Sequence, residues 1–77
     1  MFSIISDPNT GTFLLTNINS ASGIYVYDLI GNVVFQNLNT QEGNLNIDIS
    51  NHAQGIYYVK AVSQEGEILG IKKVVVQ

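Results

Sequence analysis

The chain has 77 residues, enough for one domain, with 12% charged residues and a net charge of −3. Its basic residues are only Lys60, Lys72 and Lys73, which excludes a nucleic-acid surface, because such a surface needs many cations to neutralise phosphates. No cysteine is present, so disulfides and thiolate metal sites are excluded, and no apolar run approaches the ~18 residues of a membrane span.

Apolar and β-branched residues alternate with polar ones in short runs, and clusters of Gly, Asn, Asp and Ser separate the runs. No window has the apolar spacing of a helix. In chain order, the pattern predicts seven strands over residues 2–5, 12–17, 23–29, 33–36, 45–49, 55–62 and 68–76. Seven strands at this spacing favour an all-β fold, a compact seven-stranded antiparallel β-sandwich.

Alternation also predicts which side chains share a face. The expected same-face sets are Phe13 with Leu15, Ile24 with Val26, and Leu45 with Ile47 and Ile49.

Within residues 55–62, Tyr57, Val59 and Ala61 are assigned to the core, because the charge of Lys60 must reach water. This assignment leaves Ile56 and Tyr58 on the outer face, beside Tyr25 and Tyr27. Such a patch is either cross-strand pairing or a contact surface, and pairing is the favoured interpretation.

The stretch "YDLIGNVV" is typical of a hairpin. Gly31 and Asn32 both tolerate the positive φ of a tight turn, and Asp28 can accept backbone N–H bonds across it. The stretch "SQEGEI" predicts a second hairpin in which Gly66 has the same role.

No enzymatic site emerges from the sequence. The one histidine, His52, lies in a polar loop, and the six carboxylates are scattered over different turns. No nucleophile and base pair, calcium loop or phosphate-binding loop is present. We therefore predict that the domain is not an enzyme and has no metal site and no cofactor.

Three blocks of the sequence nevertheless resemble one known family over nearly the whole chain. They are "FSIISDPNTGTF", through Pro8, Gly11 and Phe13; "IYVYDLIGNVV", through Tyr27, Asp28, Gly31 and Val34; and "IDISNHAQGIYYVKA" with the ending "KKVVV", through Gly55, Tyr57, Val59, Lys73, Val75 and Val76. In this order and spacing they resemble the type A C-terminal sorting domain of the type IX (Por) secretion system of certain Gram-negative bacteria.

The resemblance implies an Ig-like β-sandwich, with residues 1–77 as a single C-terminal sorting domain of a larger cargo protein. It implies a signal that directs the cargo through the periplasm and across the outer membrane to the cell surface or the extracellular space. The expected partners are the upstream cargo domain, the type IX translocon, and a sortase-like peptidase that cuts before Phe2 and can attach the cargo to the cell surface. The cargo would carry a separate N-terminal signal peptide, which "MFSII" is too short to provide, so Met1 is expected to begin an excised fragment.

The C-terminal residues "KKVVV" have two interpretations that are compatible with each other. In the first, the terminal strand is paired, its valines fill the core, and Lys72 and Lys73 keep an otherwise sticky strand soluble. In the second, Lys72, Lys73, Val74, Val75 and Val76 also form the surface that the translocon recognises.

An alternative function is a carbohydrate-binding or adhesive β-sandwich of a surface protein, suggested by Tyr25, Tyr27, Tyr58 and the Asn-rich loops. A purely structural Ig-like spacer is a third possibility.

Overall fold

The alternating runs form strands, as predicted. The computed structural model describes residues 2–5, 10–18, 23–38 and 43–77, and within these ranges it contains no helix. The strands are β1 Ser3–Ile5, β2 Thr12–Thr16, β3 Gly23–Tyr27, β4 Val33–Asn37, β5 Leu45–Asp48, β6 Gly55–Val62 and β7 Ile68–Val76. All seven predicted strands are confirmed, with bounds that differ by at most two residues.

Turn geometry accounts for two of the differences in the bounds. The second strand ends at Thr16, one residue early, because Asn17 has a positive φ of 62° that breaks the extended backbone. The third ends at Tyr27, because Asp28 already belongs to the following turn.

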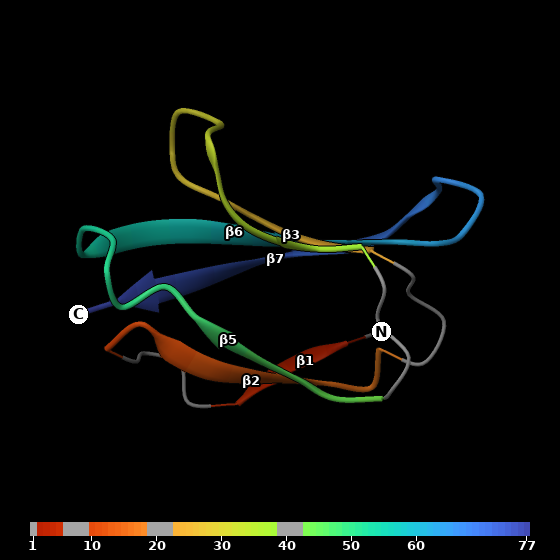
Figure 1. The fold of residues 1–77 in the computed structure, drawn as a ribbon, viewed down its shortest axis with the longest axis horizontal. Helices are drawn as coiled ribbons and strands as arrows, with labels where there is room; N and C mark the ends of the chain where they lie inside the picture. Colours follow the sequence, from red (N-terminus) through yellow and green to blue (C-terminus); the bar gives the residue numbers. More distant parts are fainter. Residues whose placement is uncertain (1, 6–9, 19–22, 39–42) are drawn as a thin grey trace.

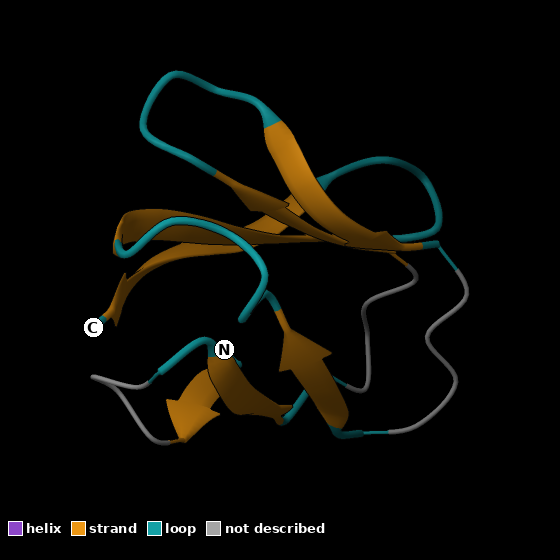
Figure 2. Cartoon of the chain, turned by 60° about the vertical axis from the view of Figure 1, so that its left-hand side comes forward, coloured by secondary structure: helices purple, strands orange, loops and turns teal. Residues whose placement is uncertain are grey.

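The strands form two antiparallel sheets, one with the order β1-β2-β5 and the other with the order β4-β3-β6-β7. The sheets stack face to face as the two layers of a sandwich (Figures 1 and 2). This is an Ig-like arrangement in which the fourth strand pairs with the third rather than joining the other sheet. The antiparallel sandwich predicted from the sequence is confirmed.

Side chains from both sheets fill the space between the layers. The buried apolar residues are Phe2, Phe13, Leu15, Ile18, Ile24, Val26, Ile47, Ile49, Tyr57, Val59, Ala61, Val74 and Val76. The predicted same-face sets are confirmed, except that Leu45 is only half-buried against this core. Fully burying one large apolar side chain contributes about 1.5–3 kcal/mol, so the core supplies most of the stabilising free energy of so small a domain.

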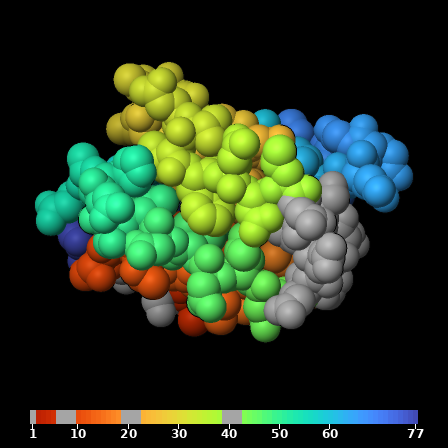
Figure 3. All heavy atoms as spheres, viewed as in Figure 1, coloured from red at the N-terminus to blue at the C-terminus, as the bar shows by residue number. Residues whose placement is uncertain are grey.

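Two hairpins project from the four-stranded sheet, one between β3 and β4 and one between β6 and β7 (Figures 1 and 3). Both are built in the same way. The Gly31 N–H donates to the Asp28 carbonyl at 3.1 Å and the Asp28 N–H to the Asn32 carbonyl at 2.9 Å. In the second hairpin, Gly66 and Ser63 make the corresponding bonds at 3.0 and 2.8 Å.

Candidate functional site

The C-terminal strand β7 is an edge strand. It lies at one end of the four-stranded sheet, and among the strands of the described residues it pairs with β6 alone. The pairing is antiparallel over the whole of β7, with one irregularity at Ala61/Val62. Within the described residues, the strand on which the sequence resemblance places the recognised residues therefore lies at one edge of the four-stranded sheet.

The two adjacent lysines of β7 lie on opposite faces of the sheet. Lys72 is paired with the buried Val59, so it is on the inner face, at the margin of the core, and it is half-buried. Lys73 is paired with Tyr58 on the outer face and is exposed. An inward-pointing charge on an edge strand hinders further pairing, so Lys72 fits the role of keeping the strand soluble, whereas Lys73 is presented to solvent.

The three valines that follow are divided in the same way. Val74 and Val76 are buried, which confirms that they fill the core. The expectation was wrong for Val75, which is only half-buried, because alternation places it on the outer face beside Ile56.

Sequence reasoning missed the exposed apolar group at the start of β7. Ile68, Leu69 and Ile71 are 60%, 41% and 52% exposed. Alternation could have placed Ile71 on the outer face with Lys73, but it could not locate the irregularity beside Leu69. We call Ile68–Lys73 the open half of β7.

The outer face of the four-stranded sheet is held by cross-strand packing. The rings of Tyr25 and Tyr27 are stacked with centroids 6.1 Å apart, and the Lys60 ammonium lies 5.2 and 5.0 Å from the two centroids. These are cation–π distances, and Lys60 is the direct partner of Tyr25 in the ladder. Tyr27 is the ladder partner of Tyr58, so the expected cross-strand pairing is confirmed for these two tyrosines.

Asp28 stabilises the β3–β4 turn, as predicted. Its carboxylate accepts bonds from the backbone N–H of Asn32 at 2.9 Å and of Ile30 at 3.0 Å, and from the Asn32 side-chain amide at 3.2 Å. The bond from the Asn32 backbone N–H contributes most to holding the pKa of Asp28 below its usual value. Gly31 has a φ of 92°, as the turn requires, whereas Asn32 does not use a positive φ.

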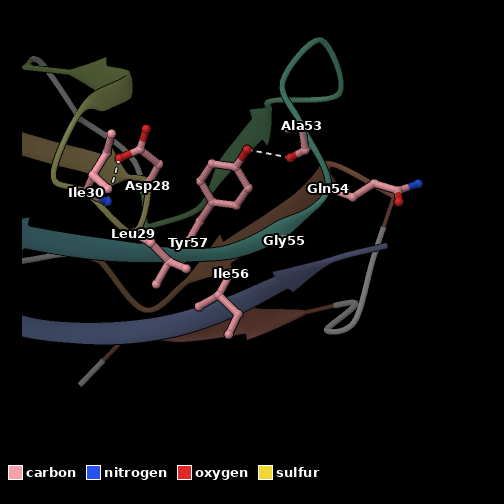
Figure 4. A pocket seen from close by; sticks show the side chains of 8 residues that line it. All are labelled: Asp28, Leu29, Ile30, Ala53, Gln54, Gly55, Ile56 and Tyr57. Atoms are coloured by element: carbon pink, nitrogen blue, oxygen red, sulfur yellow. Dashed lines mark hydrogen bonds between the residues drawn. The ribbon is translucent and has the colours of Figure 1, made fainter.

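Tyr57 fixes the corner where the chain crosses from β5 to β6. Its ring is buried, and its hydroxyl donates a hydrogen bond to the Ala53 carbonyl four residues earlier (Figure 4). This contact is the tyrosine corner of Ig-like sandwiches.

The corner between β5 and β6 and the β3–β4 turn together line an open pocket of about 250 Å³. Its lining residues are Asp28, Leu29, Ile30, Ala53, Gln54, Gly55, Ile56 and Tyr57. The structure thus brings together predicted residues from two of the three sequence blocks. The only charged group in the lining is Asp28, whose oxygens accept hydrogen bonds from the turn.

Gly11 marks a close approach between β2 and the residues after β5. A Cβ at this position would lie 2.6 Å from the Cα of Ser50, and Gly11 has a φ of 111°. The Ile49 N–H donates to the Gly11 carbonyl at 2.7 Å, and Asp48 accepts bonds from the Ser50 hydroxyl at 2.6 Å and backbone N–H at 3.0 Å. The Ser50 hydroxyl bond is the main cause of the lowered pKa of Asp48.

The remaining motif residues have simpler positions. Phe13 and Val59 are buried in the core, and Tyr27 is half-buried on the outer face. Pro8 lies outside the described residues.

Over the described ranges, no three His, Asp or Glu side chains gather as they would to hold a metal ion. His52 is exposed. In the same part of the chain, no helix is long and apolar enough to cross a membrane.

Comparison with models of known protein families gives a match. The family model described as "Secretion system C-terminal sorting domain" matches residues 4–77, which is nearly the whole chain. No curated protein matches at a significant level.

Proposed function

The chain belongs to the family of secretion system C-terminal sorting domains, the signals of type IX secretion, and from that membership we propose that its β7 strand is what the outer-membrane translocon recognises. The family is not one of catalytic domains, and its members serve export to the cell surface or the extracellular space.

The observation that supports the proposal is that some side chains of β7 are buried in the core while others are exposed. Val74 and Val76 tie the strand into the core, while Lys73 and Ile71 of the same strand are exposed at the end of the sheet. The exposed side chains of this strand are therefore held in one fixed, extended arrangement when the sandwich has folded. A receptor could in this way distinguish a folded sorting domain from an unfolded chain.

We further propose that a sortase-like peptidase cuts upstream of Phe2, and that the freed cargo is then attached to the cell surface. Over the described ranges, the carboxylates and His52 do not gather into a cluster of three, which supports a nucleophile that comes from the peptidase. The peptidase would supply the nucleophile, and the sandwich would act as the removable label.

Deleting residues 70–77 cannot test the role of β7, because it would also remove Val74 and Val76 from the core. A sharper test is the double substitution Lys72→Gln/Lys73→Gln in a fusion of a periplasmic reporter to residues 1–77, expressed in a host with type IX secretion. The matched control is Lys60→Gln, which removes the third lysine, from the neighbouring strand β6.

We expect the double variant to leave most of the reporter in the periplasm, and Lys60→Gln to behave like the wild type. Equal surface delivery of the double variant and the wild type would refute recognition through the lysines of β7. Mass spectrometry of the delivered reporter tests the processing step, since a cut before Phe2 would leave the reporter without the domain.

A further inference from the structure

The open half of β7 has the properties of a strand that pairs with another chain. At nine residues β7 is the longest edge strand in the part of the chain that the structure describes, since β4 has five residues, β5 four and β1 three. Proteins usually keep edge strands short or charged, because unpaired backbone groups invite pairing. Here the first half of a long edge instead exposes Ile68, Leu69 and Ile71.

The hydrogen bonds of the two turns establish which backbone groups point away from the sheet. The Asp28 N–H donates to the Asn32 carbonyl, toward β4. Backbone groups alternate in direction along a strand, so those of Tyr27 and Tyr25 point toward β6. Their ladder partners are Tyr58 and Lys60, whose backbone groups therefore point back toward β3.

The same alternation continues into β7. Since Tyr58 and Lys60 direct their backbone groups toward β3, their partners Lys73 and Ile71 direct theirs away from β6, to the open edge. The second hairpin gives the same result at its own end, because the Ser63 N–H donates to the Glu67 carbonyl and Ile68 follows directly. The open half of β7 thus offers a row of outward N–H and C=O groups beside an exposed lysine and exposed apolar side chains.

Charge argues for a partner of different sequence over a second copy of this chain. The only charged residues of β6 and β7 are the three lysines. Full antiparallel overlap of two β7 strands would place Lys72 opposite Lys72, because residue 72 is the centre of the strand, and a parallel in-register pair would stack both lysines on themselves. Like charges directly opposite one another are destabilising, whereas carboxylates on the added strand would be favourable.

We infer that the sorting domain is recognised by strand addition, in which an extended segment of the type IX translocon bearing carboxylates and apolar side chains pairs with the open half of β7. The inference rests on the proposed function and specifies its mode. Main-chain hydrogen bonds would supply affinity, and the contacts at Lys73 and Ile71 would supply selectivity. Since β7 belongs to a folded sheet, the recognised edge exists only in the native domain.

The test uses proline, which is tolerated on an edge strand where its nitrogen faces outward. Ile71→Pro removes one outward N–H from the open half of β7. Val33→Pro is the matched control. Val33 directly follows Asn32, whose carbonyl accepts the Asp28 N–H in the β3–β4 hairpin, so by the same alternation the Val33 N–H points outward from β4. Each variant is fused to the periplasmic reporter, and thermal unfolding of the purified domain confirms that it folds.

We expect Val33→Pro to be delivered like the wild type, and Ile71→Pro to be delivered about ten-fold less, which corresponds to about 1.4 kcal/mol of binding free energy. A folded Ile71→Pro variant that is delivered like the wild type would overturn the inference. If the wild-type fusion itself stays in the periplasm, the proposed sorting function is wrong. That outcome differs from the one that overturns strand addition, in which the wild type and Ile71→Pro are both delivered.

A second pair of variants covers the case in which Ile71→Pro does not fold. Lys73→Glu opposes a carboxylate-bearing partner strand and should reduce delivery about ten-fold, equivalent to about 1.4 kcal/mol, while Lys73→Arg should retain delivery. Equal delivery by Lys73→Glu and Lys73→Arg would refute the charge complementarity. Sedimentation that finds a wild-type dimer and a Lys73→Glu monomer would assign this edge to a second copy and overturn the inference.

Discussion

Tyr57 offers the strictest test of how this small sandwich is held together. Replacing it by alanine removes a ring that is 4% exposed and a hydroxyl that donates to the Ala53 carbonyl at the corner before β6. Truncating a buried aromatic side chain costs about 3–5 kcal/mol. A 77-residue domain has a total stability of roughly 4–12 kcal/mol, so Tyr57→Ala should remove at least about a quarter of it, and would unfold a domain at the low end of that range.

Two companion variants separate the contributions of ring and hydroxyl. Tyr57→Phe keeps the ring and removes the hydrogen bond, for an expected loss of about 0.5–1.5 kcal/mol. Tyr58→Ala, at the neighbouring position on the outer face, changes a side chain that is 37% exposed and should cost well under the loss at Tyr57.

Urea unfolding followed by circular dichroism measures all three variants, and the midpoint and slope together give the free energy of unfolding. A loss below about 1 kcal/mol for Tyr57→Ala would refute the assignment of this ring to the core. A loss for Tyr58→Ala as large as that for Tyr57→Ala would also contradict it.

Three further predictions concern the turns. Gly31→Val should destabilise the domain by about 1–2 kcal/mol or more through backbone conformation alone, because Gly31 has a φ of 92° and no atom lies within 4 Å of an added Cβ; urea unfolding measures it. Gly11→Ala should cost more than Gly31→Ala in the same assay, because its Cβ would also clash with the backbone of Ser50. The pKa values of Asp28 and Asp48 are lowered by folding, so their contribution to stability is present above the usual value of 3.8 and is lost as pH falls through the lower folded-state values. The urea midpoint of the wild type should therefore fall with pH in this range, and that of Asp28→Ala/Asp48→Ala should fall less steeply.

The local structure could be predicted from the sequence because it depends on short-range rules. Alternation and the charge of Lys60 together placed Val59 in the core and Tyr58 outside, and turn chemistry identified Asp28 and Gly31. Alternation also assigns Lys72 and Lys73 to opposite faces of the sheet, although two lysines adjacent in sequence are easily taken for a single charged patch.

The long-range features could not be predicted from the same rules. The order β4-β3-β6-β7, and with it the edge position of β7, depends on which strands pair across the whole chain. The approach of Gly11 to Ser50 joins residues far apart in sequence, and the bond from the Tyr57 hydroxyl depends on the path of the corner. The open half of β7 arises from such a combination, since neither the edge nor the irregularity near Leu69 is marked by a local signal.

The central claim is that this sandwich is by itself a sufficient address for type IX secretion. The most direct measurement is the fraction of a periplasmic reporter, fused ahead of residues 1–77, that external protease can reach on intact cells with and without a functional type IX translocon. The account predicts that the reporter becomes accessible only in cells with the translocon. A reporter that stays protected in both strains, or is equally accessible in both, would contradict it.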